Sequence, residues 1–109
     1  MTLGLYMAQR ISALIMAPLV LLHIGVMIYA IQGGLSAAEI LGRTKGSILW
    51  FAVYGTFVAA VSVHGAIGLR TVLSEWLGLR GGALNAAAWA IFALLLVPGM
   101  LAVHGVTAR

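Results

Sequence analysis

Three long uncharged stretches divide the chain. Asp, Glu, Lys and Arg are absent from residues 11–38, 46–69 and 81–108. Each stretch is longer than the roughly 20 apolar residues that an α-helix needs to cross the hydrocarbon core of a bilayer. The pattern predicts transmembrane helices at about residues 9–32, 46–74 and 84–106. We therefore expect an all-α integral membrane protein with a single domain, residues 1–109.

The composition supports this prediction. Of the 109 residues, 63% are hydrophobic and only 7% are charged, too few charges for a soluble domain of this size. The net charge of +4 is small and spread along the chain, so we expect a lipid bilayer and no nucleic acid as partner. The chain has no cysteine and can supply neither a disulfide nor a thiolate ligand to an iron–sulfur cluster.

Charge does not orient the protein in the membrane. One side is expected to hold Arg10, Arg70 and Arg80. The other side is expected to hold Arg43, Lys45 and Arg109. Because the two sides carry equal numbers of basic residues, the positive-inside rule favours neither orientation.

Several local features refine the three-helix pattern. Pro18 predicts a kink in the first helix, and Pro98 predicts a bend in the third. Residues 36–45 are predicted to form a short loop with an interfacial turn. Aromatic residues near this loop suit the membrane interface: Tyr29, Trp50 and Tyr54. Three helices of this length bury little against one another, so we expect a subunit of a larger assembly.

His64 lies inside the second uncharged stretch, where an ionisable residue marks a functional site by default. Its same-face neighbours, Ala60 and Gly68, are both small. They predict a flat recess for a porphyrin ring, and neutral imidazole is a common ligand of haem iron. The alternative is a buried histidine that is hydrogen-bonded to a neighbouring helix. We expect His64 to bind haem iron.

Two arginines are candidates for binding haem propionates. Arg70 follows His64 by six residues, about 9 Å along a helix axis, which places its guanidinium near the membrane face. Arg10 is expected at the same face on the first helix. The alternative for both is a boundary arginine that extends its charge to the headgroups.

His23 is the second histidine inside an uncharged stretch, with the bulkier Leu19 and Met27 on its face. Counted from the shared membrane face, His23 and His64 differ in depth by about 7 Å, an awkward offset for two ligands of one iron. We expect them to bind different haems, each completed by a histidine from another chain. The alternative for His23 is a structural hydrogen bond.

Glu75 and Trp76 follow the second helix at headgroup level. A carboxylate and an indole there can line a quinone pocket, as a proton partner and a hydrogen-bond donor. The alternative is an interfacial tryptophan beside a solvated glutamate. His104, near the end of the third helix, is expected at the interface without a functional role.

The second helix carries a motif of known type. His64-x-x-x-Gly68-Leu69-Arg70, followed by Glu75, resembles the second-helix motif of the cytochrome b membrane anchors of succinate dehydrogenase and fumarate reductase. In that family the histidine ligates haem b and an acidic residue stands eleven positions later, where this chain has Glu75 in place of the more usual aspartate. Trp76 stands where several small anchors have a quinone-site tyrosine.

The first helix extends the resemblance. Gln9-Arg10-Ile11-Ser12 looks like the family's His-Arg-x-Ser/Thr motif, with Gln9 as a departure from it. The spacing from Gln9 to His23 is similar to that in the single-chain dihaem anchors, where histidines on both corresponding helices are haem ligands. The resemblance covers residues from about 6 to 77.

The resemblance implies an architecture and partners. The three helices would be half of a two-subunit haem-binding helical bundle in the bacterial cytoplasmic (inner) membrane, with the N-terminus in the cytoplasm. The chain would be a non-catalytic membrane-anchor subunit of succinate dehydrogenase or fumarate reductase. Its implied partners are a second three-helix anchor subunit, an iron–sulfur subunit and a flavoprotein subunit.

The resemblance also implies cofactors. One or two b-type haems would be shared with the partner anchor. Their implied binding residues are His64, His23, Arg70 and Arg10. A quinone would be the substrate, at a site formed by Arg10, Glu75 and Trp76.

Two other classes of protein stay open at this point: a small membrane transporter subunit and a non-haem membrane assembly protein. A proton-coupled transporter is expected to carry a membrane-embedded carboxylate, whereas Glu39 and Glu75 both lie outside the predicted spans. The residues also leave open whether the electrons come from succinate oxidation or drive fumarate reduction.

Overall fold

The structure is a computed structural model that describes residues 2–108, with the backbone alone for residue 37. Its four helices are α1 (Leu3–Gly33), α2 (Ala37–Thr44), α3 (Ile48–Leu77) and α4 (Gly81–Thr107). Within the described residues, α1, α3 and α4 are the helices long and apolar enough to cross a membrane. The prediction of an all-helical protein with three candidate spans is therefore confirmed.

The predicted helix ends were less accurate. α1 begins at Leu3 rather than near residue 9, because the Thr2 side chain accepts a hydrogen bond from the backbone N–H of Leu5 (3.2 Å) and caps the helix. α3 runs to Leu77 and ends at Gly78, whose φ of 72° suits a residue without a side chain. The third long helix begins at residue 81 instead of 84.

The segment predicted as a loop with a turn is the short helix α2. Its N-cap is Ser36, whose hydroxyl accepts a hydrogen bond from the backbone N–H of Glu39 at 3.2 Å. The hydroxyl of Thr44 donates to the carbonyl of Val106 at 2.6 Å, and the N–H of Gly46 donates to the carbonyl of Thr107 at 2.8 Å. These bonds fasten the end of α2 to the end of α4.

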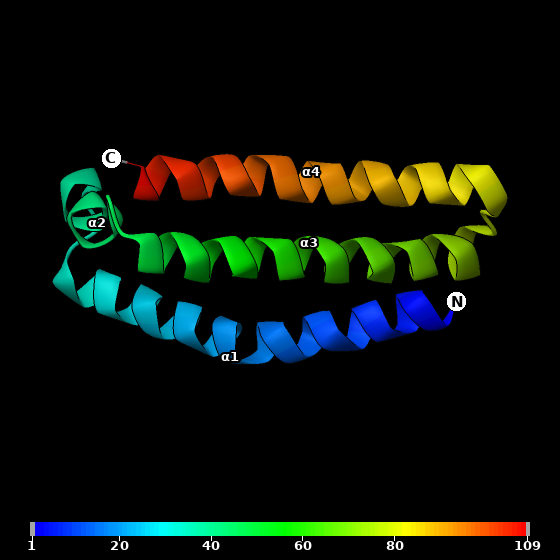
Figure 1. Ribbon diagram of the computed structural model, residues 1–109, viewed down its shortest axis with the longest axis horizontal. Helices are drawn as coiled ribbons and strands as arrows, with labels where there is room; N and C mark the ends of the chain where they lie inside the picture. Colours follow the sequence, from blue (N-terminus) through cyan, green and yellow to red (C-terminus); the bar gives the residue numbers. More distant parts are fainter. Residues whose placement is uncertain (1, 109) are drawn as a thin grey trace.

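The three long helices run side by side, with α3 between α1 and α4 (Figure 1). α2 lies across the end of the bundle that holds the C-terminus, and the N-terminus lies at the opposite end. α1 changes direction about halfway along, in agreement with the kink predicted at Pro18. The molecule measures 47 × 22 × 22 Å, so its length suits a bilayer.

Small residues set the distance between α3 and α4. A Cβ atom added at Gly99 of α4 would lie 2.6 Å from Cγ1 of Val58 on α3. One added at Gly65 of α3 would lie 3.0 Å from Cδ1 of Leu95 on α4. The two backbones approach closely because these positions lack side chains.

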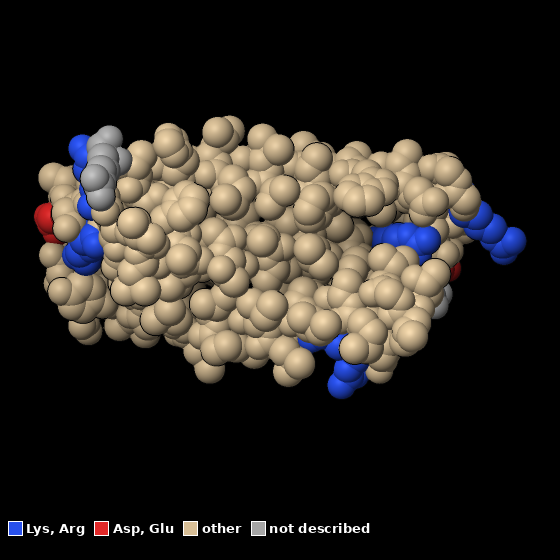
Figure 2. All heavy atoms as spheres, viewed as in Figure 1, with Lys and Arg blue, Asp and Glu red and all other residues tan. Residues whose placement is uncertain are grey.

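The outer surface is apolar between two charged ends. Lys and Arg gather at the two ends of the molecule, and the middle is free of charge in this view (Figure 2). Large apolar side chains such as Leu14, Leu21 and Leu94 are more than 70% exposed. Lipid chains or neighbouring transmembrane helices must cover them.

Substitution of Gly99 tests the packing of α3 against α4. Gly99→Ala should destabilise the protein by roughly 1–3 kcal/mol, because the β-branched Val58 cannot swing away from the new methyl group. Gly105→Ala is the matched control on the same helix, with no described atom within 4 Å of the added Cβ, and should be neutral or stabilising. Thermal denaturation of the purified protein in detergent distinguishes them, and equal melting temperatures would contradict this packing.

Candidate functional site

His64 is half-buried in the interior of α3. Ala60, one turn earlier, is only 6% exposed, so the imidazole extends from a closely packed part of the helix. The Nδ1 atom of His64 is buried and has no hydrogen-bond partner among residues 2–108. A buried polar atom without a partner costs roughly 1–3 kcal/mol. The described residues therefore do not satisfy Nδ1, and because this atom is buried, a ligand from outside them can reach the ring only at its other nitrogen, Nε2.

Gly68, one turn after His64, does not open the recess that its size predicts. A Cβ atom added at Gly68 would lie 3.6 Å from Nε2 of Gln9, so the carboxamide of Gln9 on α1 already fills this space. Oε1 of Gln9 is likewise buried without a hydrogen-bond partner in the described part of the chain. Two unsatisfied polar atoms thus lie in this part of the bundle, one on His64 and one on Gln9, whose side chain packs beside the residue one helical turn after His64.

His23 packs among aromatic rings at a different depth. Its ring centroid lies 5.3 Å from that of Phe57 and 6.4 Å from that of Tyr54. These two residues precede His64 by seven and ten positions, which is about 10–15 Å along α3. This separation exceeds the predicted 7 Å, because α1 begins six residues before the start used for that prediction and His23 therefore lies deeper, whereas the smaller extension at the end of α3 offsets only part of this change. A shared iron between His23 and His64 of one chain is therefore excluded in this arrangement.

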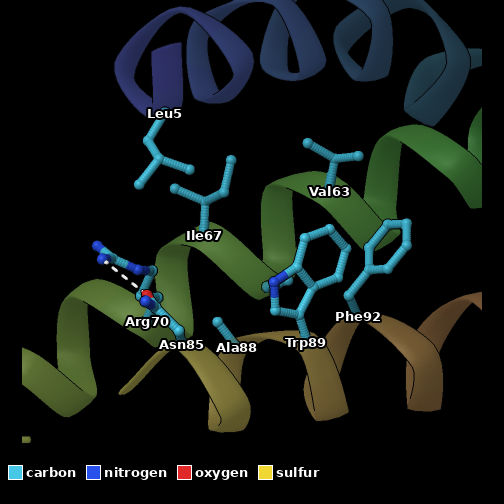
Figure 3. Close-up of a pocket in the computed structure, with 9 residues that line it drawn as sticks. Leu5, Val63, Ile67, Arg70, Asn85, Ala88, Trp89 and Phe92 are labelled. Atoms are coloured by element: carbon cyan, nitrogen blue, oxygen red, sulfur yellow. Dashed lines mark hydrogen bonds between the residues drawn. The ribbon is translucent and has the colours of Figure 1, made fainter. Parts of the chain in front are cut away.

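Arg70 lines a cavity of about 280 Å³ at the end of the bundle that holds the N-terminus (Figure 3). Its Nη2 atom donates a hydrogen bond to Oδ1 of Asn85 on α4 at 3.4 Å. Leu5 of α1 borders the cavity from the opposite side, and Trp89 and Phe92 of α4 form an apolar wall with their rings nearly perpendicular. The cavity thus combines apolar walls with a guanidinium and an amide at one end.

The residues predicted for the quinone site, Arg10, Glu75 and Trp76, do not line this cavity, and Arg70, which was predicted to bind haem propionates, does. Arg10 is exposed on α1, with its guanidinium carbon 5.6 Å from the ring centroid of Tyr6. Glu75 is exposed in the last turns of α3, and Trp76 is 81% exposed. Within the described residues, the structure brings Arg70 together with Asn85 instead.

Asn85 and Trp89 were not predicted as site residues. A signal for them was present, because Asn85 is an amide inside the third uncharged stretch and Trp89 follows it by one helical turn. Their proximity to Arg70 depends on the pairing of α3 with α4, which the pattern along one helix does not reveal.

A larger groove, of about 1050 Å³, lies at the opposite end between α1, α2 and the first turns of α3. It is lined in part by His23, Tyr29, Arg43, Trp50 and Tyr54. The rings of Trp50 and Tyr54 are stacked, with centroids 5.3 Å apart and planes 25° from parallel. These aromatic residues were predicted only as an interfacial belt, and the structure shows that they also form one wall of this groove.

The described residues contain no cluster of three or more His, Cys, Asp or Glu side chains that could hold a metal ion. His64 and His23 can each offer one imidazole at its own depth, so an iron bound by either needs further ligands from a porphyrin and from another chain. His104 is exposed near the end of α4, where an interfacial residue was expected.

Comparison with known proteins agrees with the motif on α3. No curated protein and no solved structure matches the chain significantly. The family model described as "Succinate dehydrogenase/Fumarate reductase transmembrane subunit" matches residues 1–102. The chain therefore belongs to this family and is a membrane subunit of the multi-subunit succinate dehydrogenase/fumarate reductase complex.

Proposed function

We propose that this subunit binds haem b through His64 and forms part of a quinone site. It anchors the flavoprotein and iron–sulfur subunits of a bacterial succinate dehydrogenase to the cytoplasmic membrane. A second three-helix subunit completes the membrane domain. The dicarboxylate chemistry belongs to the other subunits, and this chain contributes binding groups.

The observation that carries the proposal is the unsatisfied imidazole of His64. A structural histidine at this depth should donate to or accept from a neighbouring helix, and no residue from 2 to 108 bonds its buried Nδ1 atom. Coordination through one ring nitrogen leaves the other as a donor. Oε1 of Gln9 is an acceptor that also lacks a partner, on the helix that faces α3.

The residues present fit a haem between two subunits. His64 lines neither of the two cavities described above, so a ring bound to it must be covered by a neighbouring chain. Arg70 lies six residues further toward the end of the bundle, and Arg10 is exposed at the same end of α1. Both can pair with propionates at the membrane surface. When bound, haem b supplies a one-electron redox centre.

The cavity beside Arg70 supports a quinone site at this end of the bundle. Its guanidinium and the amide of Asn85 can donate hydrogen bonds to a quinone carbonyl, and the apolar walls suit the ring. Arg10, Glu75 and Trp76 lie at the same end and are exposed toward a neighbouring subunit. In this proposal the Glu75 carboxylate, exposed at the same end of the bundle, exchanges protons as the quinone is reduced.

One argument supports the assignment of sides. A quinone site must lie close to the subunit that delivers electrons, so the end with Arg70 should face the iron–sulfur subunit and the cytoplasm.

Substitution of His64 tests the haem assignment. His64→Ala should remove the haem bound at that residue, because no other described histidine lies within reach of the same iron. The haem-to-flavin ratio of the purified complex measures this loss. His104→Ala is the matched control on the exposed end of α4 and should keep the wild-type ratio. A full haem content in His64→Ala would remove the ligand assignment.

His23 is assigned to a second haem. His23→Ala should lower the haem-to-flavin ratio by about half, because each histidine serves a different iron. The redox titration of the remaining haem should match one component of the wild-type titration. An unchanged ratio would count against a ligand role for His23.

Arg70→Gln tests the quinone cavity. Loss of a charged hydrogen bond should raise the KM for quinone about tenfold or more, since such bonds contribute roughly 1.5–3 kcal/mol. Electron transfer from succinate to a soluble dye should stay unchanged in the same preparation. Arg80→Gln is the control, an exposed arginine in the loop before α4. An unaltered quinone KM in Arg70→Gln would show that this cavity is not the site.

A further inference from the structure

The groove at the end of the bundle that holds α2 contains an imidazole and a guanidinium together. His23 lines it from α1, and Arg43 lines it from α2. At about 1050 Å³ it is much larger than the cavity beside Arg70, and its other walls are aliphatic and aromatic. A ligand that fills it must be large, mostly apolar and able to use a cation at one edge.

Arg43 is held in one position. Its Nη2 atom donates to the carbonyl of Gly34 at 3.0 Å, and its guanidinium carbon lies 5.4 Å from the ring centroid of Tyr29. A Cβ atom added at Gly33 would lie 3.5 Å from Nη1, so the absence of a side chain there gives the guanidinium its room. A guanidinium has five N–H donors, and the Gly34 carbonyl uses one. The others can bind an anion.

The position of α2 supports this arrangement. Thr44, the residue after Arg43, is 6% exposed, and its hydroxyl donates to the carbonyl of Val106 at 2.6 Å, with the carbonyl of Ile40 3.1 Å away as an alternative acceptor. The N–H of Gly46 bonds Thr107 at the end of α4. The helix that presents Arg43 is therefore anchored to the bundle, and the cation is part of the groove rather than a free surface charge.

The sequence spacing from His23 to the ring that carries the Arg43 guanidinium equals the spacing from His64 to Arg70. Tyr29, over which the Arg43 guanidinium lies, follows His23 by six residues, or about 9 Å along α1. Arg70 follows His64 by the same six residues on α3. In both places a histidine inside the bundle is accompanied by an arginine nearer the end of the bundle. Arg10 and Arg70 lie at the far end of the bundle from this groove.

The charges around the groove suit an anionic edge. Lys45 follows directly after α2 and is exposed. The carboxylate of Glu39 occupies the space beside the Cα atom of Gly34, and Glu39 does not line the groove. Among the described residues that line the groove, Arg43 is thus the only Asp, Glu, Lys or Arg, and its charge is positive.

We propose that Arg43 binds the propionate carboxylates of the haem whose iron is ligated by His23. The groove between α1, α2 and the start of α3 is then the site of this ring, with its carboxylates toward α2. The inference rests on the second haem of the proposed function and adds the residue that orients it. A phospholipid with its phosphate at Arg43 is the competing occupant. A phospholipid would not use the imidazole of His23 as an iron ligand.

The test uses the complete complex purified from membranes, with Arg43→Gln, His23→Ala and Lys45→Gln. Lys45→Gln is the matched control, because it removes a cation two residues away that does not line the groove. The haem-to-flavin ratio and the redox titration of each haem are measured. Loss of the guanidinium should lower the midpoint potential of one haem, because a nearby cation favours the reduced state, and should weaken the retention of that haem.

The expected result is that Arg43→Gln changes the same haem that His23→Ala removes, whereas Lys45→Gln matches the wild type. If His23→Ala loses a haem but Arg43→Gln matches Lys45→Gln in both measurements, the role of Arg43 in binding propionates is refuted. The assignment of the second haem to His23 is then supported. If His23→Ala keeps its full haem content, the inference fails together with the second haem, and the assignment of His64 is unaffected.

An experimental map of the wild-type complex decides the matter even if Arg43→Gln does not assemble. The inference requires flat density with a metal at its centre between His23 and Arg43. Acyl-chain density with a phosphate at Arg43, or a helix of another subunit in the groove, would overturn it.

Discussion

The constraint on which this structure depends is that a polar group inside a bilayer must find a partner there. Several buried hydroxyl groups find this partner in a backbone carbonyl one helical turn earlier. Ser62 donates to the carbonyl of Val58 at 2.7 Å, and Thr107 donates to that of Val103 at 2.6 Å. His64 and Gln9 each have a buried side-chain atom without a partner among residues 2–108. These two residues belong to the motifs on α3 and α1 that resemble the family.

The same constraint explains why the chain is a subunit. α3 has neighbours on two sides, α1 and α4, and these contacts bury mainly small residues such as Ala60 and Ala66. Close approach of the backbones leaves little space inside the chain for a porphyrin at His64. The ring proposed there must lie between this chain and another, in agreement with the membership of a multi-subunit complex.

The sequence predicted the three spans, the kink of α1 and the family motif, because all of these depend on local pattern. The helix ends were missed where a cap decides them, as at Thr2 and Gly78. The prediction of an open recess at Gly68 was wrong, because the space beside a small residue can be filled by another helix as readily as by a ligand. The groove at Arg43 and the pairing of Arg70 with Asn85 depend on contacts between helices, which single-helix spacing does not contain.

The central claim is that an imidazole of this chain is an axial ligand of a membrane haem. Electron paramagnetic resonance of the oxidised, purified wild-type complex tests it most directly, read together with near-infrared magnetic circular dichroism, because these spectra report the axial ligands of ferric haem. The account predicts low-spin haem with two imidazole ligands. A complex without haem signals, or a haem whose axial ligands include no imidazole, would contradict it.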